Sequence, residues 1–293
     1  MSIRPQQTIS RVVTVQGVGF LTGADVTVRF HPAPEQAGIT FQRVDLPGTG
    51  AIPALVEYVT PRQRRTALAW GGATVELVEH VLAALAGLQI DNCRIELDAC
   101  ELPGLDGSSQ AFADALLRAG LVEHDAPRRV VQLRQPVSVS EPGQEVRGVP
   151  SDEPGLTLSY SLDYGEGSPI PRQSFEVRLT PEAFLNEVVY ARTFVLEQEV
   201  AALRAQGYGR RTTTADLLIY GTEGVVGNTL RSANECARHK LLDCVGDFAL
   251  LGCDLSGRIE AHRSGHSLNS RFIRQVCLSH PAESRPMPEQ RAA

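Results

Sequence analysis

The chain has 293 residues, a length that suggests two domains at roughly 150 residues each. Hydrophobic residues make up 42% and charged residues 21% of the sequence, near the averages of about 45–50% and about 25% in globular proteins, which excludes a disordered chain. The formal net charge is −6, the wrong sign for neutralising phosphates, and argues against a nucleic-acid partner.

The sequence contains no pattern of a membrane-spanning or exported protein. No apolar stretch reaches roughly 18–20 residues, and residues 1–7 lack the apolar core of a signal peptide. Six cysteines occur without a Cys-x-x-Cys pair, which argues against a disulfide framework and a structural zinc site. We therefore expect a cytoplasmic protein with no integral membrane segment, and no obligate protein partner is evident.

Alternating β-branched segments divided by Gly and Pro predict a β-meander in the first third of the chain. A nearly all-apolar segment then predicts a buried helix, and a second helix follows a turn and a capping serine. The expected strands cover 11–16, 25–30, 38–44 and 93–97, and the expected helices cover 75–88 and 109–121.

The strand pattern restarts after residue 127, which we take as a domain boundary. Thr180 and Pro181 predict the start of one helix, and a capping box of Ser232 and Glu235 predicts another that runs to about residue 251. The further strands are expected at 130–133, 137–140, 156–162 and 175–179, the domains at 1–127 and 128–280, and a disordered tail at 281–293.

Two helical segments echo each other. His80 and His239 are each followed by a leucine two residues on and a glycine seven residues on. Such an echo indicates an internal duplication, although two buried helices can share three positions by chance. In a duplication, each half is a sheet with helices on one face, and the two helix layers can pack against each other.

His239 and Asp243 lie four residues apart on the helix expected from residue 232. This spacing places both side chains on one helix face, one turn apart, within reach of one Zn²⁺ ion. Asp247 lies on the same face, one turn further. A solvated helix face with a charge-assisted pair would show the same spacing, so the pattern alone leaves both interpretations open.

Glu79 and His80 are ionisable residues at the start of an otherwise apolar helix. Burying an unpaired charge is costly, so both need partners. With His80 as a third ligand and Glu79 as general base, the residues would match zinc hydrolases, in which three protein ligands leave one position open for water. A half-exposed helix start is the alternative.

His262 and His266 are also four residues apart, but Gly265 and the strand-like segment 258–261 argue against a shared helix. We therefore do not interpret these histidines as a metal pair. His266, on a glycine turn, is better placed as an acid, although a loop histidine without function would look the same.

Several motifs occur in order over residues 7–276 and together resemble a known family. They are Glu79-His80-x-Leu-Ala-Ala-Leu-Ala-Gly87, Pro103-x-x-Asp106-Gly-Ser108, Ala191-Arg-Thr-Phe194, Arg238-His-Lys-x-Leu-Asp-x-x-Gly-Asp247 and Ser264-Gly-His-x-Leu-Asn269. In order and spacing the chain resembles the UDP-3-O-acyl-N-acetylglucosamine deacetylases, the zinc amidases of lipid A synthesis.

The resemblance implies a role for each matching residue. His80, His239 and Asp243 would bind the metal, which is Zn²⁺ or, because the same ligands accept it, Fe²⁺. The remaining implied roles are Glu79 as general base, His266 as acid or electrostatic partner oriented by Asp247, Thr193 as stabiliser of the oxyanion, Lys240 as catalytic cation, and Phe194, Lys240 and Arg263 as substrate-binding residues.

The resemblance also implies the fold class, an α+β protein of two domains. Each domain would be a mainly antiparallel sheet with helices on one face, and the helix layers would pack together in a β/α/α/β sandwich. Small inserts beside the site are expected within 45–70 and about 194–230, the second shaping the passage for the acyl chain. The chain departs from the family at Leu21, which replaces a histidine, and in the second insert.

The expected function is zinc-dependent release of acetate from UDP-3-O-acyl-N-acetylglucosamine, a small-molecule substrate. One alternative keeps the chemistry but changes the substrate to another N-acetylated sugar nucleotide, because the inserts differ. Another alternative is a non-catalytic paralogue that binds a ligand at the same place. All the residues with implied metal-ligand and acid–base roles are present, which argues against a non-catalytic paralogue.

Overall fold

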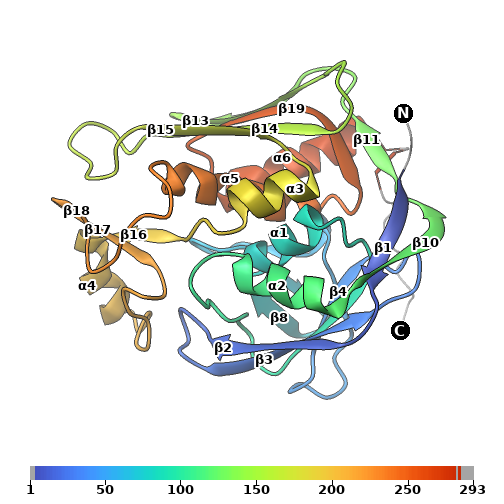
Figure 1. The fold of residues 1–293 in the computed structure, drawn as a ribbon, viewed down its shortest axis with the longest axis horizontal. Coiled ribbons are helices and arrows are strands. Elements are labelled where there is room, and N and C mark those ends of the chain that lie inside the picture. Colours follow the sequence, from blue (N-terminus) through green and yellow to red (C-terminus); the bar gives the residue numbers. More distant parts are fainter. Residues whose placement is uncertain (1–3, 282, 285–293) are drawn as a thin grey trace.

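The computed structural model describes residues 4–281, 283 and 284. Within this part of the chain, two large β-sheets enclose a double layer of helices (Figure 1). This is the α+β sandwich that the sequence predicts, and the expected fold class is confirmed. Of the expected disordered tail, Glu283 forms an ion pair with Arg134 at 2.6 Å, while residues 282 and 285–293 lie outside the described residues.

The first sheet has the strand order β2-β3-β9-β4-β5. β9 pairs antiparallel with β3 and parallel with β4, so the predicted simple meander is wrong. Local alternation identifies strands but carries no information on which distant strand inserts between them. The strands are β2 (Val13–Val18), β3 (Asp25–Pro32), β9 (Cys93–Leu97), β4 (Ile39–Arg43) and β5 (Ile52–Pro53).

The second sheet has the order β12-β13-β19-β14-β15, with β11 also beside β19. β19 pairs antiparallel with β13 and parallel with β14. Both sheets therefore repeat the same series of antiparallel and parallel neighbours, which agrees with an internal duplication. The strands are β11 (Val130–Gln132), β12 (Val137–Glu141), β13 (Gln144–Val149), β14 (Leu156–Leu162), β15 (Gln173–Arg178) and β19 (Asp254–His262).

The chain passes from the first sheet to the second through β10. Strand β1 (Pro5–Ile9) pairs antiparallel with β10 (Leu121–Pro127), and β11 then begins the second sheet. The domain boundary at residue 127 stays a prediction. Among the described residues, no helix has the length and hydropathy needed to cross a membrane.

The helix expected at 75–88 begins later than predicted. The first residues of that segment form strand β8 (Ala73–Glu76), and Leu77 has a φ of +62°, so helix α1 (Glu79–Gly87) begins only at Glu79. A short apolar run looks alike in a buried strand and in a buried helix. The correction places Glu79 and His80 in the first turn of α1.

The predicted capping box at Ser232 and Glu235 is wrong. Helix α5 (Glu235–Ala249) begins at Glu235, and its N-cap residue, Asn234, makes no side-chain capping hydrogen bond. The side-chain oxygen of Gln173 instead accepts a hydrogen bond from the backbone N–H of Ala237 at 3.1 Å. Glu235 instead accepts hydrogen bonds from the Arg192 guanidinium at 2.8 Å and from the backbone N–H of Arg231 at 2.6 Å. The carboxylate of Glu235, which a capping box would need, is therefore occupied by the ion pair with Arg192.

Helices α1 and α5 pack closely between the two sheets (Figure 1). Gly246 permits the contact, because a Cβ atom there would lie 2.1 Å from the carbonyl oxygen of Glu79. Thr180 caps the helical turn that begins at Pro181, as predicted. The other helices of the double layer are α2 (Gln110–Ala119), α3 (Pro181–Ala183), the π-helical turn Phe184–Val188 and α6 (His266–Ser279).

Two small sheets lie in or next to the ranges where inserts are expected; β8, in the first of them, lies beyond residue 70. The order in the first is β6-β7-β8 and in the second β16-β17-β18. The second small sheet and helix α4 lie together at one end of the molecule (Figure 1). The elements are β6 (Val59–Thr60), β7 (Ala67–Trp70), β16 (Phe194–Leu196), α4 (Glu197–Ala205), β17 (Leu218–Gly221) and β18 (Gly224–Val225), with the helical turn Val56–Tyr58 before β6.

Candidate metal and catalytic site

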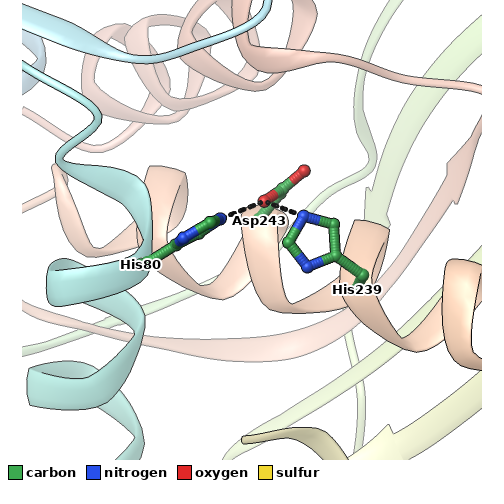
Figure 2. Close-up of side chains that lie close together, drawn as sticks. All are labelled: His80, His239 and Asp243. Carbon is green, nitrogen blue, oxygen red and sulfur yellow. Dashed lines mark ion pairs between the residues drawn. The ribbon is translucent and has the colours of Figure 1, made fainter. Parts of the chain in front are cut away.

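Helices α1 and α5 bring His80, His239 and Asp243 together (Figure 2). The Nε2 atoms of His239 and His80 lie 3.3 and 3.7 Å from Oδ1 of Asp243. One potential ligand atom of each residue lies within 4.8 Å of the others, and all three residues are buried. The predicted pair on α5 and the predicted third residue on α1 are therefore neighbours.

The atoms of this cluster fit a divalent cation. Nδ1 of His239 donates to the carbonyl oxygen of Ala191 at 3.0 Å, so its Nε2 carries the lone pair that a metal requires. Oδ1 of Asp243 is buried and has no hydrogen-bond partner among the described residues. Burial lowers the pKa of His80 to about 3, so this imidazole is neutral. Two imidazoles and a carboxylate form a set that Zn²⁺ accepts.

Lys240 holds the other oxygen of Asp243. Its Nζ donates to Oδ2 at 2.7 Å, and its side chain is largely buried. Burial opposes the charged form, but Asp243, Tyr160 and Tyr164 together outweigh burial and raise the pKa of Lys240. Lys240 therefore orients a candidate ligand and also brings a fixed positive charge to the site.

Glu79 stands beside the cluster in the first turn of α1. Its side chain is buried, and Oε2 accepts a hydrogen bond from the backbone N–H of Thr66 at 3.0 Å. Burial raises the pKa of Glu79 to about 7. A carboxylate with a pKa near neutrality is suited to general-base catalysis, because it can accept a proton and release it again.

His266 faces Glu79 from the first turn of α6. Its Nε2 lies 3.8 Å from Oε1 of Glu79, and its Nδ1 donates to Oδ2 of Asp247 at 2.9 Å. Burial opposes the charge on the imidazole, but the carboxylates of Asp247 and Glu79 outweigh burial and raise the pKa of His266 to about 9. Near neutral pH His266 is therefore a cation that can donate a proton.

Comparison with known proteins shows which family the chain belongs to. The model of the family described as UDP-3-O-acyl N-acetylglycosamine deacetylase matches residues 6–278. The chain belongs to this family. The resemblance identified from the motifs is thereby confirmed, and with it the expected class, a hydrolase that acts on an amide.

Three curated relatives that match nearly the whole chain are named UDP-3-O-acyl-N-acetylglucosamine deacetylase. A relative from Myxococcus xanthus is 36% identical over 98% of this chain and 90% of its own length. One from Anaeromyxobacter dehalogenans is 38% identical over 96% of this chain and 89% of its own. One from Oleidesulfovibrio alaskensis is 35% identical over 92% of this chain and 88% of its own.

In this member of the family a cavity of about 650 Å³ opens over the cluster of His80, His239 and Asp243. Its size is that of a small-molecule binding site. Thr193, Phe194, Lys240, Glu79 and His266 all line it. Its apolar part comes from the turn between β2 and β3, the residue after β8, helix α4 and the second small sheet with the loop before β17. The apolar residues are Phe20, Leu21, Leu77, Val195, Val200, Leu203, Leu217 and Ile219.

Thr193 and Phe194 lie beside the candidate metal ligands, whereas Arg263 does not. The backbone N–H of Thr193 donates to the carbonyl oxygen of Gly107 at 2.8 Å, and the ring of Phe194 packs edge-on against His239 with centroids 6.2 Å apart. Arg263 is exposed and is not among the described residues that line the cavity. Its role in substrate binding stays a prediction.

Three residues that hold the site are absent from the predicted set. Asn269 donates from Nδ2 to Oδ2 of Asp247 at 2.8 Å. Arg192 pairs with Glu235 at 2.8 Å, and both side chains are buried. Asn269 and Arg192 belong to the motifs that carry the resemblance, so those motifs could have identified them. Thr66 belongs to no motif, and no signal in the sequence marks it.

Proposed function

We propose that this protein hydrolyses the acetamide of UDP-3-O-acyl-N-acetylglucosamine and releases acetate, a reaction of lipid A synthesis in the cytoplasm. The curated relatives are named for this activity. The observation that carries the proposal is the convergence of His80, His239 and Asp243 beside an opposed base and acid, Glu79 and His266.

The metal ion would be held by His80, His239 and Asp243. When bound there, a divalent ion polarises the substrate carbonyl and makes a water molecule more acidic. We propose Zn²⁺, which suits two imidazoles and one carboxylate. Fe²⁺ accepts the same ligands and is the alternative. Elemental analysis of the purified protein distinguishes the two ions.

Glu79 and His266 would divide the proton transfers of the reaction. Glu79 accepts a proton from the attacking water, whose oxygen bonds to the acetamide carbon. His266, held cationic by Asp247, donates a proton to the sugar nitrogen as the carbon–nitrogen bond breaks, so that the amine and acetate leave. The separation of 3.8 Å between the two groups supports this division of roles, because both could then reach the same amide.

The remaining predicted residues would stabilise charge and hold the substrate. As negative charge builds on the carbonyl oxygen, Thr193 and the cationic His266 would stabilise it. Lys240 contributes a positive charge inside the cavity, and Phe194 a ring against His239. Arg263, on the exposed surface, would meet the diphosphate of the nucleotide. The apolar part of the cavity would take the 3-O-acyl chain.

The proposal is tested by measuring acetate release together with bound metal. The purified protein is assayed on UDP-3-O-acyl-N-acetylglucosamine, on UDP-N-acetylglucosamine without the acyl chain, and on other N-acetylated UDP-sugars. Release from the acylated substrate alone supports the proposal. Release from another sugar nucleotide instead supports the second candidate, which the substituted Leu21 in the cavity lining favours. Full metal content without release from any of them supports a binding paralogue.

A further inference from the structure

Thr66 contacts the candidate base and the carboxylate that orients the candidate acid. It lies directly before β7 and is 2% exposed. Its backbone N–H donates to Oε2 of Glu79 at 3.0 Å, and its hydroxyl Oγ1 donates to Oδ1 of Asp247 at 2.5 Å. One residue thus joins groups from α1 and α5, which belong to different halves of the chain.

The backbone of Thr66 is fixed against the start of α1. Its carbonyl oxygen accepts a hydrogen bond from the N–H of Val78 at 3.3 Å, and Val78 directly precedes Glu79. Thr66 therefore exchanges hydrogen bonds with two consecutive residues at the start of α1. Because the backbone is held, the hydroxyl has a set position relative to Glu79.

Asp247 is held at both oxygens. Oδ2 accepts hydrogen bonds from Nδ1 of His266 at 2.9 Å and Nδ2 of Asn269 at 2.8 Å. Among the described residues, the hydroxyl of Thr66 is the donor to Oδ1. Asp247 is fully buried, so without Thr66 this oxygen would have no donor from the described protein. A carboxylate fixed at one oxygen only is free to rotate and to carry its histidine with it.

We propose that Thr66 is a positioning residue that sets the imidazole of His266 against Glu79 by locking the carboxylate of Asp247. The inference rests on the proposed deacetylation, for which the base and the acid must face one amide. Thr66 acts on both groups at once, through its N–H on the base and through its hydroxyl on the partner of the acid.

Two substitutions separate the hydroxyl from the shape of the side chain. Thr66→Val keeps the branched shape and the backbone N–H but cannot donate to Asp247, whereas Thr66→Ser keeps the hydroxyl. We expect Thr66→Val to lower kcat by about 10–100-fold, the usual effect of removing a group that orients a catalytic residue. We expect KM to stay within about twofold and Thr66→Ser to recover most of kcat.

A double-mutant cycle tests whether Thr66 acts through Asp247. If it does, Thr66→Val has little further effect on kcat in an Asp247→Ala background, because the group that it orients is gone. Equal losses in the two backgrounds overturn the inference, as does a loss in Thr66→Ser that matches the loss in Thr66→Val. If Thr66→Val does not fold, Thr66→Ala is measured in the same way, since a methyl group cannot donate either.

Thr8→Val is the matched control. Thr8 is buried, and its hydroxyl donates to the carbonyl oxygen of Asn92 at 2.7 Å, away from the site. We expect this variant to lose stability but to keep kcat. Metal content is measured in all variants and should be unchanged. Wild-type protein that releases no acetate defeats the proposed function, whereas an active wild type with an equally active Thr66→Val defeats the inference about Thr66 alone.

Discussion

Nε2 of His266 lies 3.8 Å from Oε1 of Glu79, although the two residues belong to helices of different halves of the chain. Glu79 stands in the first turn of α1 and His266 in the first turn of α6. Each group favours the charged form of the other. The carboxylate of Glu79 raises the pKa of His266, and the imidazolium of His266 lowers the pKa of Glu79. The site is therefore complete only when the two helix layers are packed together.

The activity should follow a bell-shaped pH profile. The base works when Glu79 is deprotonated, so activity rises with pH through its pKa of about 7. The acid works when His266 is protonated, so activity falls as pH rises through its pKa of about 9. A bound metal cation stabilises the carboxylate and opposes the imidazolium, which lowers both values. We expect the two limbs of kcat/KM at or below about 7 and about 9.

His266→Gln tests whether titration of His266 causes the alkaline limb of the pH profile. The amide side chain cannot titrate, so the variant should lose this limb and most of its activity while it keeps its metal. The measurement is kcat/KM against pH for wild type and variant, with metal content determined on the same samples. An alkaline limb that persists unchanged in His266→Gln would assign it to another cation, and Lys240 is then the first to substitute.

Each of the three candidate ligands should be needed for metal binding. Alanine at His80, His239 or Asp243 leaves two ligands, and we expect metal affinity to fall by at least about tenfold. Metal content after dialysis and the thermal unfolding midpoint are measured together. His31→Ala is the control, because His31 pairs with Glu96 at 2.9 Å elsewhere in the first sheet. Full metal retention in all three ligand variants would contradict the assignment.

The sequence predicts the site best where its geometry is local. His239 and Asp243 are one turn apart on a single helix, so their proximity follows from their spacing. His80 and His266 come from other helices, so no spacing predicts their position. The chemistry of zinc hydrolases suggests His80 as a third ligand, and the family resemblance is needed to add His266. Thr66 has its partners 13 and 181 residues away. No local pattern marks such a residue, because its importance arises from the packing of two halves.

The errors in secondary structure have the same origin. The first turn of the helix expected at 75–88 is lost because Val75 and Glu76 pair with strand β7 and Leu77 then adopts a positive φ, which an apolar run does not reveal. The capping box fails because Arg192, distant in sequence, binds the carboxylate of Glu235. The meander fails because β9 enters between β3 and β4. In each case a tertiary contact overrides a correct local preference.

Gly246→Ala should separate the helices that carry the site. The added Cβ atom would lie 2.1 Å from the carbonyl oxygen of Glu79, a backbone atom that moves only if α1 moves. Overpacking a core costs about 1–3 kcal/mol, and we expect the upper end of this range together with loss of activity. Urea unfolding and acetate release provide the measurements. Gly50→Ala is the control, since nothing lies within 4 Å of its Cβ position, and full stability and activity of Gly246→Ala would refute this account.

Leu203→Trp should shorten the acyl chain that the enzyme prefers. Leu203, on α4, lines the apolar part of the cavity, and the larger ring would fill space available to the end of the chain. Each buried methylene contributes about 0.8 kcal/mol, so excluding two of them should lower kcat/KM for the longer substrate by about tenfold. The measurement compares kcat/KM for two substrates that differ by two methylenes, in wild type and variant.

Leu230→Trp controls for the effect of a tryptophan in the same segment. Leu230 is 38% exposed and is not among the described residues that line the cavity, so this variant should keep the wild-type ratio between the two substrates. Metal content and the pH profile should stay unchanged in both variants, because neither Leu203 nor Leu230 is a candidate metal ligand or acid–base residue. If Leu203→Trp lowers kcat/KM equally for both chain lengths, the end of the acyl chain does not lie against α4. The side of the cavity around Leu21 is then the place to repeat the substitution.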